Sequence, residues 1–214
     1  MRLLDLFCGA GGAAMGYYQA GFTDIVGIDA NCQKRYPFEF IQGDALEFCE
    51  KYGKDFDIIH ASPPCQAYSV TKSLHNNKHP ELIEVTRNLL KQTGKKYIIE
   101  NVAGVKFILD NPIMLCGTMF DLRVLRHRYF ETFPVIWFPP RQCQHIGKAS
   151  GNKNYKGKKR TLEFWEYLTI TGHDFIVNDA QIAMGINWMR KDELSQAIPP
   201  AYTKWIGQQI LGLI

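Results

Sequence analysis

Short apolar runs alternate with stretches of helical periodicity through the first half of the chain, and this alternation constrains the fold more than any other feature. A glycine turn and a helix to about Gln19 follow the first run, and helical patterns follow later runs at 45–52 and 80–92. A β-α-β rhythm of this kind predicts a doubly wound, mostly parallel sheet. The expected strands are Leu3–Phe7, Asp24–Asp29, Phe38–Gln42, Phe56–Ala61 and Lys96–Val102.

The rhythm changes after Pro112. A strand is expected at Val124–Phe133, in a hairpin with Ile113–Cys116, and the glycine- and lysine-rich stretch 134–174 is expected to be irregular. Short helices at 179–185 and 192–197 and a terminal helix at 202–213 complete the pattern. We therefore divide the chain into residues 1–133, 134–175 and 176–214.

Bulk properties fit an ordinary globular protein. The chain has 214 residues, enough for one domain with a real core, and no apolar run approaches the length of a membrane span. The first expected strand follows Arg2 directly, so we expect no signal peptide, and the six cysteines form no Cys-x-x-Cys pair. We expect reduced thiols, a cytoplasmic location and no membrane partner.

Two short motifs stand directly after expected strands. Pro63-Pro64-Cys65-Gln66 follows one apolar run, and Glu100-Asn101-Val102 ends another. The carboxyl ends of strands in an open parallel sheet border the ligand crevice, so a thiol and a carboxylate would meet there. That pair suits covalent catalysis with an acid-base partner. A lone cysteine is usually a buried apolar residue, but the two prolines and the polar loop around Cys65 argue against burial.

A glycine-rich turn follows the first expected strand. The run Asp5-Leu6-Phe7-Cys8-Gly9-Ala10-Gly11-Gly12 opens a helix, where backbone amides can approach a ligand. Asp29 and Asp44 stand at the ends of the next two strands, so three successive strand ends carry ligand-type groups. This arrangement predicts a cofactor that contains a nucleoside. Asp44 alone is equally well explained as the N-cap of the helix that begins at Ala45.

Positive charge is concentrated in two places. Arg126 and Arg128 would share one face of a strand and could hold a carbonyl, phosphate or carboxylate, although an exposed basic strand paired with surface acids explains these two residues better when they are taken alone. Removing a stripe of six charges from the net charge of +4 leaves −2, so this stripe is either a footprint for a polyanion or a solvated loop. Its members are Lys148, Lys153, Lys156, Lys158, Lys159 and Arg160.

A metal site is not expected from the sequence. Cys143 and His145 stand two positions apart, but the further histidine considered with them, His173, is distant. Two ligands at this spacing are too few to indicate zinc.

Together these residues resemble the C5-cytosine DNA methyltransferases, particularly the small forms of phages and bacteria. The resemblance covers most of the chain, and the order of the glycine loop, Pro-Pro-Cys and Glu-Asn-Val is highly specific. It implies the class I methyltransferase fold, S-adenosylmethionine as cofactor, DNA (as a duplex) as partner and a monomeric enzyme. Residues 1–133 would be the catalytic domain, 134–175 a target-recognition region and 176–214 helices that pack back on the catalytic domain.

The resemblance also implies roles. Cys65 would add to carbon 6 of cytosine, Glu100 would bind ring N3 and the exocyclic amine, and Arg128, with Arg126, would hold the base oxygen or a phosphate. The stripe from Lys148 to Arg160 would contact DNA phosphates. The implied cofactor-binding residues are Phe7, Cys8, Gly9, Gly11, Gly12, Asp29, Asp44, Ala45 and Pro64.

The sequence departs from the family in three places. Val124 stands where the family usually has glutamine, the segment Ala197–Tyr202 replaces a motif that contains Gly-Asn, and the target-recognition region is small. Two alternatives to a DNA enzyme stay open. One is an RNA cytosine methyltransferase on the same scaffold, and the other is a non-catalytic relative that binds DNA or cofactor.

Overall fold

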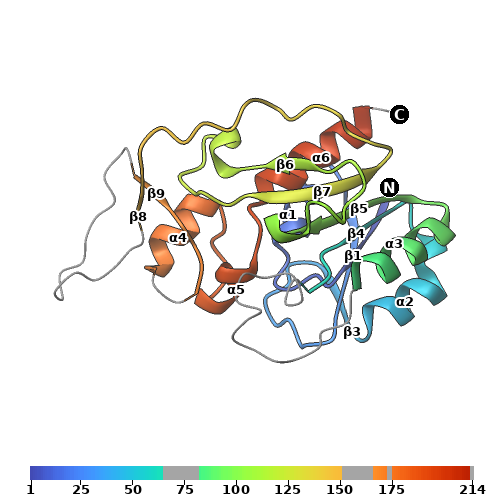
Figure 1. The fold of residues 1–214 in the computed structure, drawn as a ribbon. Helices are drawn as coiled ribbons and strands as arrows, with labels where there is room; N and C mark the ends of the chain where they lie inside the picture. Colours follow the sequence, from blue (N-terminus) through green and yellow to red (C-terminus); the bar gives the residue numbers. More distant parts are fainter. Residues whose placement is uncertain (65–81, 151–165, 173–174, 213–214) are drawn as a thin grey trace, which may run out of the picture.

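A seven-stranded sheet forms the centre of the protein, seen here in a computed structural model that describes residues 1–64, 82–150, 166–172 and 175–212 (Figure 1). In this part of the chain the strand order is β3-β2-β1-β4-β5-β7-β6. The first five strands in this order are mutually parallel, and β7 runs antiparallel to both β5 and β6. The strands are β1 (Arg2–Leu6), β2 (Asp24–Asp29), β3 (Glu39–Gln42), β4 (Ile58–Ala61), β5 (Lys96–Asn101), β6 (Ile113–Leu115) and β7 (Arg128–Phe133).

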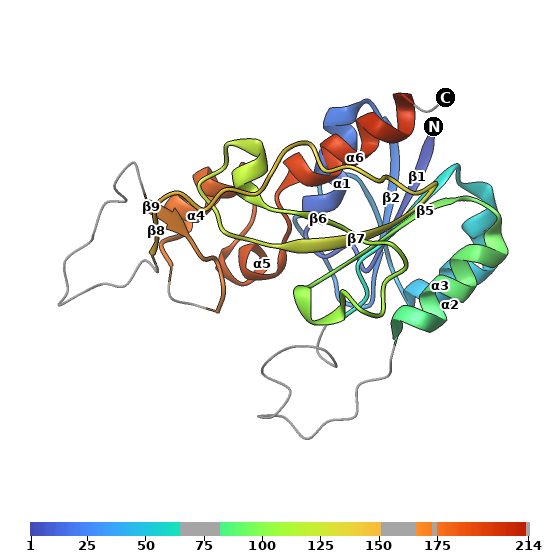
Figure 2. The ribbon, with the colours of Figure 1, turned by 45° about the horizontal axis from the view of Figure 1, so that its top comes forward.

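Helices cover both faces of this sheet, which confirms the predicted doubly wound architecture (Figure 2). The helices α1 (Gly12–Ala20) and α6 (Pro200–Gly212) lie on one face, and α2 (Ala45–Tyr52) and α3 (Leu82–Thr93) lie on the other. The helix expected from Pro80 is thus described from Leu82 onward.

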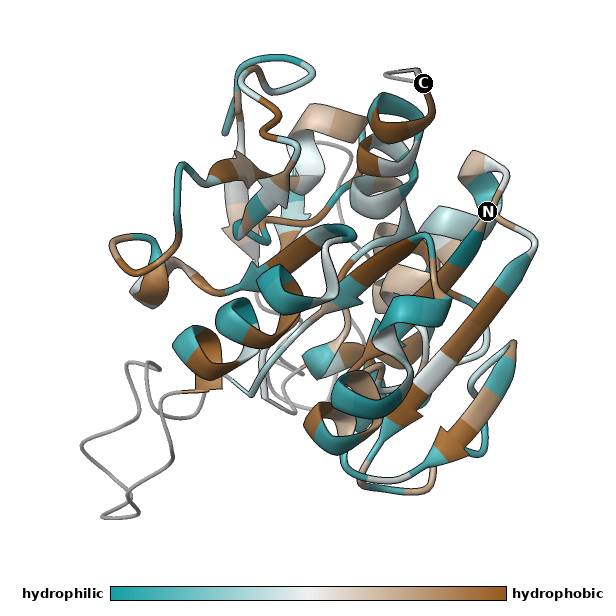
Figure 3. Ribbon diagram, turned by 90° about the vertical axis from the view of Figure 1, so that its right-hand side faces the viewer, coloured by the Kyte–Doolittle hydropathy of each residue, from teal (hydrophilic) through white to brown (hydrophobic). Residues whose placement is uncertain are grey.

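Alternate residues of each strand supply the two apolar layers. Leu3 of β1 packs in the cluster beneath α1 and α6, whereas its neighbour Leu4 packs beneath α2 and α3. Because successive side chains of a strand point to opposite faces, a strand buried on both sides is mostly apolar. Hydrophobic residues accordingly run along the strands, while the covering helices mix hydrophobic and hydrophilic residues (Figure 3).

The terminal helix α6 packs closely on α1. A side chain at Gly16 would overlap the Thr203 hydroxyl and the Pro200 carbonyl, so glycine is needed for this approach. The Thr203 hydroxyl donates to the carbonyl of Ala13, at 2.8 Å. This packing brings the residues just before α6 to the start of α1. None of the described helices is both long and apolar enough to cross a membrane.

A smaller unit stands beside the sheet. It contains β8 (Lys148–Ser150) paired in parallel with β9 (Glu166–Leu168), followed by α4 (Val177–Met184) and α5 (Lys191–Gln196). Leu168, Phe175 and Met184 belong to its apolar cluster. The expectation of an irregular stretch through 134–174 is therefore wrong where β8 and β9 pair.

The expected strand Val124–Phe133 is also shorter than predicted, because β7 begins at Arg128. Before that point the chain pairs with the smaller unit instead of the main sheet: the Leu125 amide donates to the carbonyl of Leu168 at 2.9 Å, and the Leu168 amide donates to that of Arg123 at 2.8 Å. The predicted hairpin is confirmed, since β6 pairs with β7. Short 3-10 turns complete the described fold, at Gly53–Asp55 (η1), Ala103–Val105 (η4) and Gly117–Phe120 (η5).

Candidate active site

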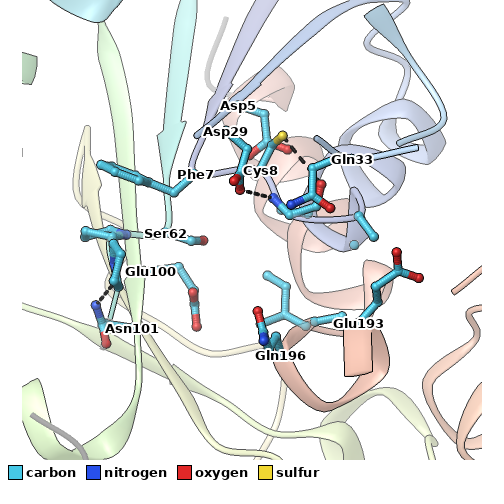
Figure 4. A pocket seen from close by; sticks show the side chains of 18 of the residues that line it. Asp5, Phe7, Cys8, Asp29, Gln33, Ser62, Glu100, Asn101, Glu193 and Gln196 are labelled. Atoms are coloured by element: carbon cyan, nitrogen blue, oxygen red, sulfur yellow. Dashed lines mark hydrogen bonds between the residues drawn. The ribbon is translucent and has the colours of Figure 1, made fainter. Parts of the chain in front are cut away.

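A pocket of about 640 Å³ opens at the carboxyl ends of β1, β2, β4 and β5 (Figure 4). This is the edge at which ligands bind in open parallel sheets. Four segments from the sheet side meet α5 and the chain after it across the opening. The lining comprises Asp5, Phe7, Cys8, Gly9, Ala10, Gly12, Ala13, Asp29, Ala30, Asn31, Gln33, Ser62, Pro63, Pro64, Glu100, Asn101, Val102, Arg128, Glu193, Ser195, Gln196, Ala197 and Ile198.

The glycine loop forms one wall of the pocket. Phe7 and Gly9 have positive φ angles of 56° and 50°, which turn the chain sharply between β1 and α1. The Gly9 amide donates to Oδ2 of Asp29 at 3.0 Å, and the Asn31 amide donates to Oδ1 of the same carboxylate at 2.9 Å. The loop and the end of β2 are thereby fixed to each other. Six of the nine predicted cofactor-binding residues line the pocket: Phe7, Cys8, Gly9, Gly12, Asp29 and Pro64.

The other three predicted cofactor-binding residues lie outside the lining. Gly11 packs against the next loop, where an added Cβ would come within 2.6 Å of Cδ of Pro37. Asp44 caps α2, because its Oδ1 accepts the amides of Leu46 and Glu47 at 2.8 and 3.0 Å. The capping explanation thus accounts for Asp44, and its neighbour Ala45 is buried as the first residue of that helix.

The segment Glu100-Asn101-Val102 joins two strand ends. The side-chain amide of Asn101 donates to the carbonyl of Pro63 at 2.9 Å, so β5 holds the chain that leaves β4. Glu100, the residue before it, points into the pocket opposite Gln196 (Figure 4). The motif therefore has two tasks. Glu100 lines the pocket, and Asn101 holds the Pro63-Pro64 segment in place. Cys65, the predicted nucleophile, comes next in the chain and lies outside the described residues.

Glu100 is buried and paired with Arg128. Nε of Arg128 lies 2.9 Å from Oε1 of Glu100, which is an ion pair by distance. The same oxygen is buried without a hydrogen bond of good geometry among the described residues, so the contact is a charge pair that leaves Oε1 able to accept a hydrogen bond from a ligand. Burial raises the pKa of Glu100, and the charges of Arg128 and Arg126 and a hydrogen bond from Ser62 oppose that rise. A carboxyl group with a raised pKa is suited to proton transfer.

Arg126 has a different setting from Arg128. It precedes β7, is 4% exposed, and donates to the carbonyls of Ile170 and Ser195 at 2.6 and 2.7 Å. Arg128 lines the pocket, whereas Arg126 does not. The two guanidinium groups therefore do not form the pair expected on one strand. Arg126 ties the chain before β7 to the segment after β9 and to the end of α5.

The basic stripe falls almost entirely outside the described residues. The backbone of Lys148 begins β8. Lys153, Lys156, Lys158, Lys159 and Arg160 lie in the part that the structure does not describe. Their predicted contact with DNA stays a prediction.

Several pocket residues gave no signal in the sequence. Glu193, Ser195 and Gln196 come from α5 and its end, and Gln33 comes from the loop after β2. The guanidinium of Arg35 donates to both carboxylate oxygens of Glu193, each at 2.8 Å, which closes this side of the pocket. Ala197 and Ile198, from the segment that replaces the Gly-Asn motif, also reach the lining.

A buried chain of polar groups lies behind the pocket. The Tyr17 hydroxyl is 3.0 Å from Nδ1 of His60, and Nε2 of His60 is 3.0 Å from Oγ of Ser62. Burial lowers the pKa of His60 to about 3, so the ring is neutral at physiological pH. His60 thus orients Ser62, which lines the pocket beside Glu100.

This histidine should make the protein less stable in mild acid. The unfolded chain takes up a proton on His60 below about pH 6.5, whereas the folded protein does not until about pH 3, so stability falls as pH falls between these values. Between pH 6.5 and pH 5 the loss is about 2 kcal/mol. We expect the free energy of unfolding of the wild type, minus that of His60→Gln, to fall by this amount between pH 7 and pH 5 in urea titrations.

The quantity to measure is the difference in unfolding free energy between the wild type and His60→Gln. Burial raises the pKa of Asp5 and of Glu100, so these two groups make each protein more stable as the pH falls, and their effect cancels in the difference. A difference that stays constant with pH would show that His60 is not held neutral.

The sheet order, the antiparallel strand β7 between β5 and the edge strand β6, and the glycine loop that opens onto the pocket define a class I methyltransferase fold. A solved protein encoded within an E. coli prophage and described as a candidate DNA modification methyltransferase shares this fold. The two superpose with a TM-score of 0.64 over 100% of this chain and 99% of that one, at 13% identity.

Sequence comparison supplies the family. Residues 1–108 match the model of the C-5 cytosine-specific DNA methylases, and the chain belongs to this family. It is 33% identical over 114 residues to Type II methyltransferase M.FnuDI of Fusobacterium nucleatum and 29% identical over 120 residues to M.XorII of Xanthomonas oryzae pv. oryzae. These matches cover 49% and 48% of this chain, and 33% and 28% of the two relatives, so the chain matches only about a third of their length.

Proposed function

We propose that this protein transfers a methyl group from S-adenosylmethionine to carbon 5 of cytosine in duplex DNA, through a covalent bond between Cys65 and carbon 6 of a flipped-out base. The observation that carries the proposal is the position of Glu100. Its buried carboxyl group is paired with Arg128 and faces the pocket that also contains the glycine loop and the Pro63-Pro64 turn. The buried carboxyl group of Glu100, the glycine loop and the Pro63-Pro64 segment that precedes Cys65 meet at one opening, which supports the proposal.

The pocket residues fit S-adenosylmethionine. The volume lies in the range of small-molecule sites, and four carboxylates but one guanidinium line it. The Asp29 carboxylate, at a strand end, suits a ribose diol, and lining carboxylates suit a ligand that carries a sulfonium and an ammonium group. Bound there, S-adenosylmethionine would supply an electrophilic methyl group. The lining carboxylates are those of Asp5, Asp29, Glu100 and Glu193.

The protein's own groups would act on the cytosine ring. Carbon 5 is a poor nucleophile until the Cys65 thiolate adds to carbon 6, which forms a C–S bond and turns the ring into an enamine. Glu100 would hydrogen-bond ring N3 and the exocyclic amine and stabilise the charge that develops during addition. After carbon 5 is methylated, loss of its proton to a base restores the double bond and breaks the C–S bond, which returns the thiolate.

DNA as the substrate follows from family membership and from charge. The stacked bases of a duplex hide both ring faces, so the target base must leave the helix at a cost of a few kcal/mol. The six cations from Lys148 to Arg160 suit contacts with phosphates, which position a protein but do not specify a sequence. In this proposal residues 134–175 form the target-recognition region, attached to the catalytic residues 1–133, and Arg128 holds the base oxygen.

The test is methyl transfer from labelled S-adenosylmethionine to duplex DNA and to structured RNA of the same cytosine content. We expect label in the duplex, recovered as 5-methyldeoxycytidine after nuclease digestion and mass spectrometry. Label in RNA alone would replace DNA with RNA as the substrate. Binding of cofactor without transfer to either polymer would indicate a non-catalytic relative and overturn the proposal.

A further inference from the structure

Two cysteines and two histidines converge near the outer edge of the sheet, away from the pocket. They are Cys116 after β6, His127 before β7, and Cys143 and His145 in the segment that follows β7. One potential ligand atom from each residue lies within 4.8 Å of all the others. The fold brings together residues that are up to 29 positions apart in the sequence, such as Cys116 and His145. For this reason the sequence alone did not indicate a metal site.

The distances between sulfur and nitrogen atoms suit a tetrahedral ion. Nε2 of His145 lies 3.0 Å from Sγ of Cys143 and 3.5 Å from Sγ of Cys116, and Nε2 of His127 lies 3.4 Å from Sγ of Cys143. Zinc–sulfur bonds of about 2.3 Å and zinc–nitrogen bonds of about 2.0 Å at tetrahedral angles place these atoms about 3.5 Å apart. The cluster thus has nearly the dimensions of a four-coordinate zinc site.

We propose that Cys116, His127, Cys143 and His145 bind one structural zinc ion. Two thiolates and two imidazoles are a ligand set that favours zinc over calcium or magnesium, which prefer oxygen. All four positions would be filled by protein atoms, as in structural rather than catalytic zinc sites.

The surroundings of the cluster support this assignment. The Thr118 hydroxyl lies 3.5 Å from the sulfur of Cys116 and 3.6 Å from that of Cys143, so it can donate a hydrogen bond to one of the two thiolates. The imidazole rings of His127 and His145 are stacked, with centroids 4.9 Å apart. Among the described residues, neither cysteine forms a disulfide.

The ion would connect two parts of the molecule. Cys116 and His127 flank the edge strands β6 and β7, whereas Cys143 and His145 belong to the segment that leads to β8. His127 directly precedes Arg128, which pairs with Glu100 in the pocket. Zinc would therefore fix the start of the small unit to the strand that carries Arg128, and its loss would loosen residues 134–147 first.

Metal analysis of purified full-length protein without an affinity tag tests the proposal independently of methyl transfer. After incubation with zinc and exhaustive dialysis, we expect about one zinc ion per chain in the wild type and in Cys32→Ser, a control at an exposed cysteine. In Cys143→Ser we expect fewer than about 0.2 ions per chain. Cobalt in place of zinc should give a thiolate-to-cobalt absorption band in the wild type that Cys143→Ser lacks.

His145→Ala keeps the test decisive if a cysteine variant fails to fold, because His145 is exposed and its loss removes little packing. A strong chelator should lower the melting temperature of the wild type and speed proteolysis between residues 134 and 147, but change neither property in His145→Ala. Zinc below about 0.2 ions per chain in the wild type, equal zinc in Cys143→Ser, or a Cys116–Cys143 disulfide would overturn the proposal.

Discussion

Replacement of Cys65 by serine is expected to lower the rate of methyl transfer to DNA at least about 10³-fold, because a hydroxyl is a far weaker nucleophile than a thiolate toward carbon 6 of cytosine. Binding of S-adenosylmethionine should change little, since the residues proposed to hold it lie in the glycine loop and at Asp29. The measurements are single-turnover transfer of labelled methyl groups and calorimetric binding of the cofactor.

Cys32→Ser is the matched control. Cys32 is exposed and outside the pocket lining, so this variant should transfer methyl groups at the wild-type rate. Near-normal transfer by Cys65→Ser would refute the assignment of the nucleophile. Loss of cofactor binding together with transfer would instead mean that the change disturbs the pocket.

Glu100→Gln should cause the second largest loss. Glutamine keeps the size of the side chain but cannot share a proton with ring N3 and cannot pair its charge with Arg128, 2.9 Å away. Removing one preorganised group that stabilises developing charge costs about 10²–10³ in turnover, or roughly 3–4 kcal/mol. We expect this loss in kcat for DNA methylation, with little change in the KM for S-adenosylmethionine.

Two controls separate chemistry from folding in this experiment. Glu50→Gln changes an exposed glutamate of α2 in the same way and should leave kcat unaltered. The urea unfolding midpoint of Glu100→Gln should lie near or above that of the wild type, because the buried carboxyl group is costly to ionise. A kcat within twofold of the wild type would show that Glu100 does not take part in the reaction.

The sheet could be predicted because each of its main strands is marked by a short apolar run in the sequence. Mostly apolar runs such as Leu3–Leu6 and Tyr97–Ile99 are buried on both faces, and such runs can be recognised in the local sequence. The limits of β7 could not be predicted, because residues before Arg128 pair with Leu168, about forty positions later. The strands β8 and β9 are three residues each and likewise depend on their pairing across the chain.

The candidate active site likewise contains residues that the local sequence predicts and residues that only the fold reveals. The glycine loop, Asp29 and Glu100 stand at strand ends, where a parallel sheet brings its ligand groups, and they were predicted. Glu193 and Gln196 were missed, since a contact between Arg35 and Glu193, 158 positions apart, brings α5 to the pocket. Asp44 caps α2 and lies outside the pocket lining, and its predicted contact with the cofactor stays a prediction, because a strand end and a helix N-cap favour the same residue type.

Trapping with a fluorinated base tests the central claim most directly. Fluorine at carbon 5 of the target cytosine blocks the proton loss that releases the enzyme, so methylation should leave Cys65 bonded to carbon 6. We predict a denaturation-resistant complex of protein and DNA that forms only with S-adenosylmethionine, with the crosslinked peptide containing Cys65. Failure to form this complex on a duplex whose unfluorinated form is methylated, or a crosslink at another cysteine, would contradict the account.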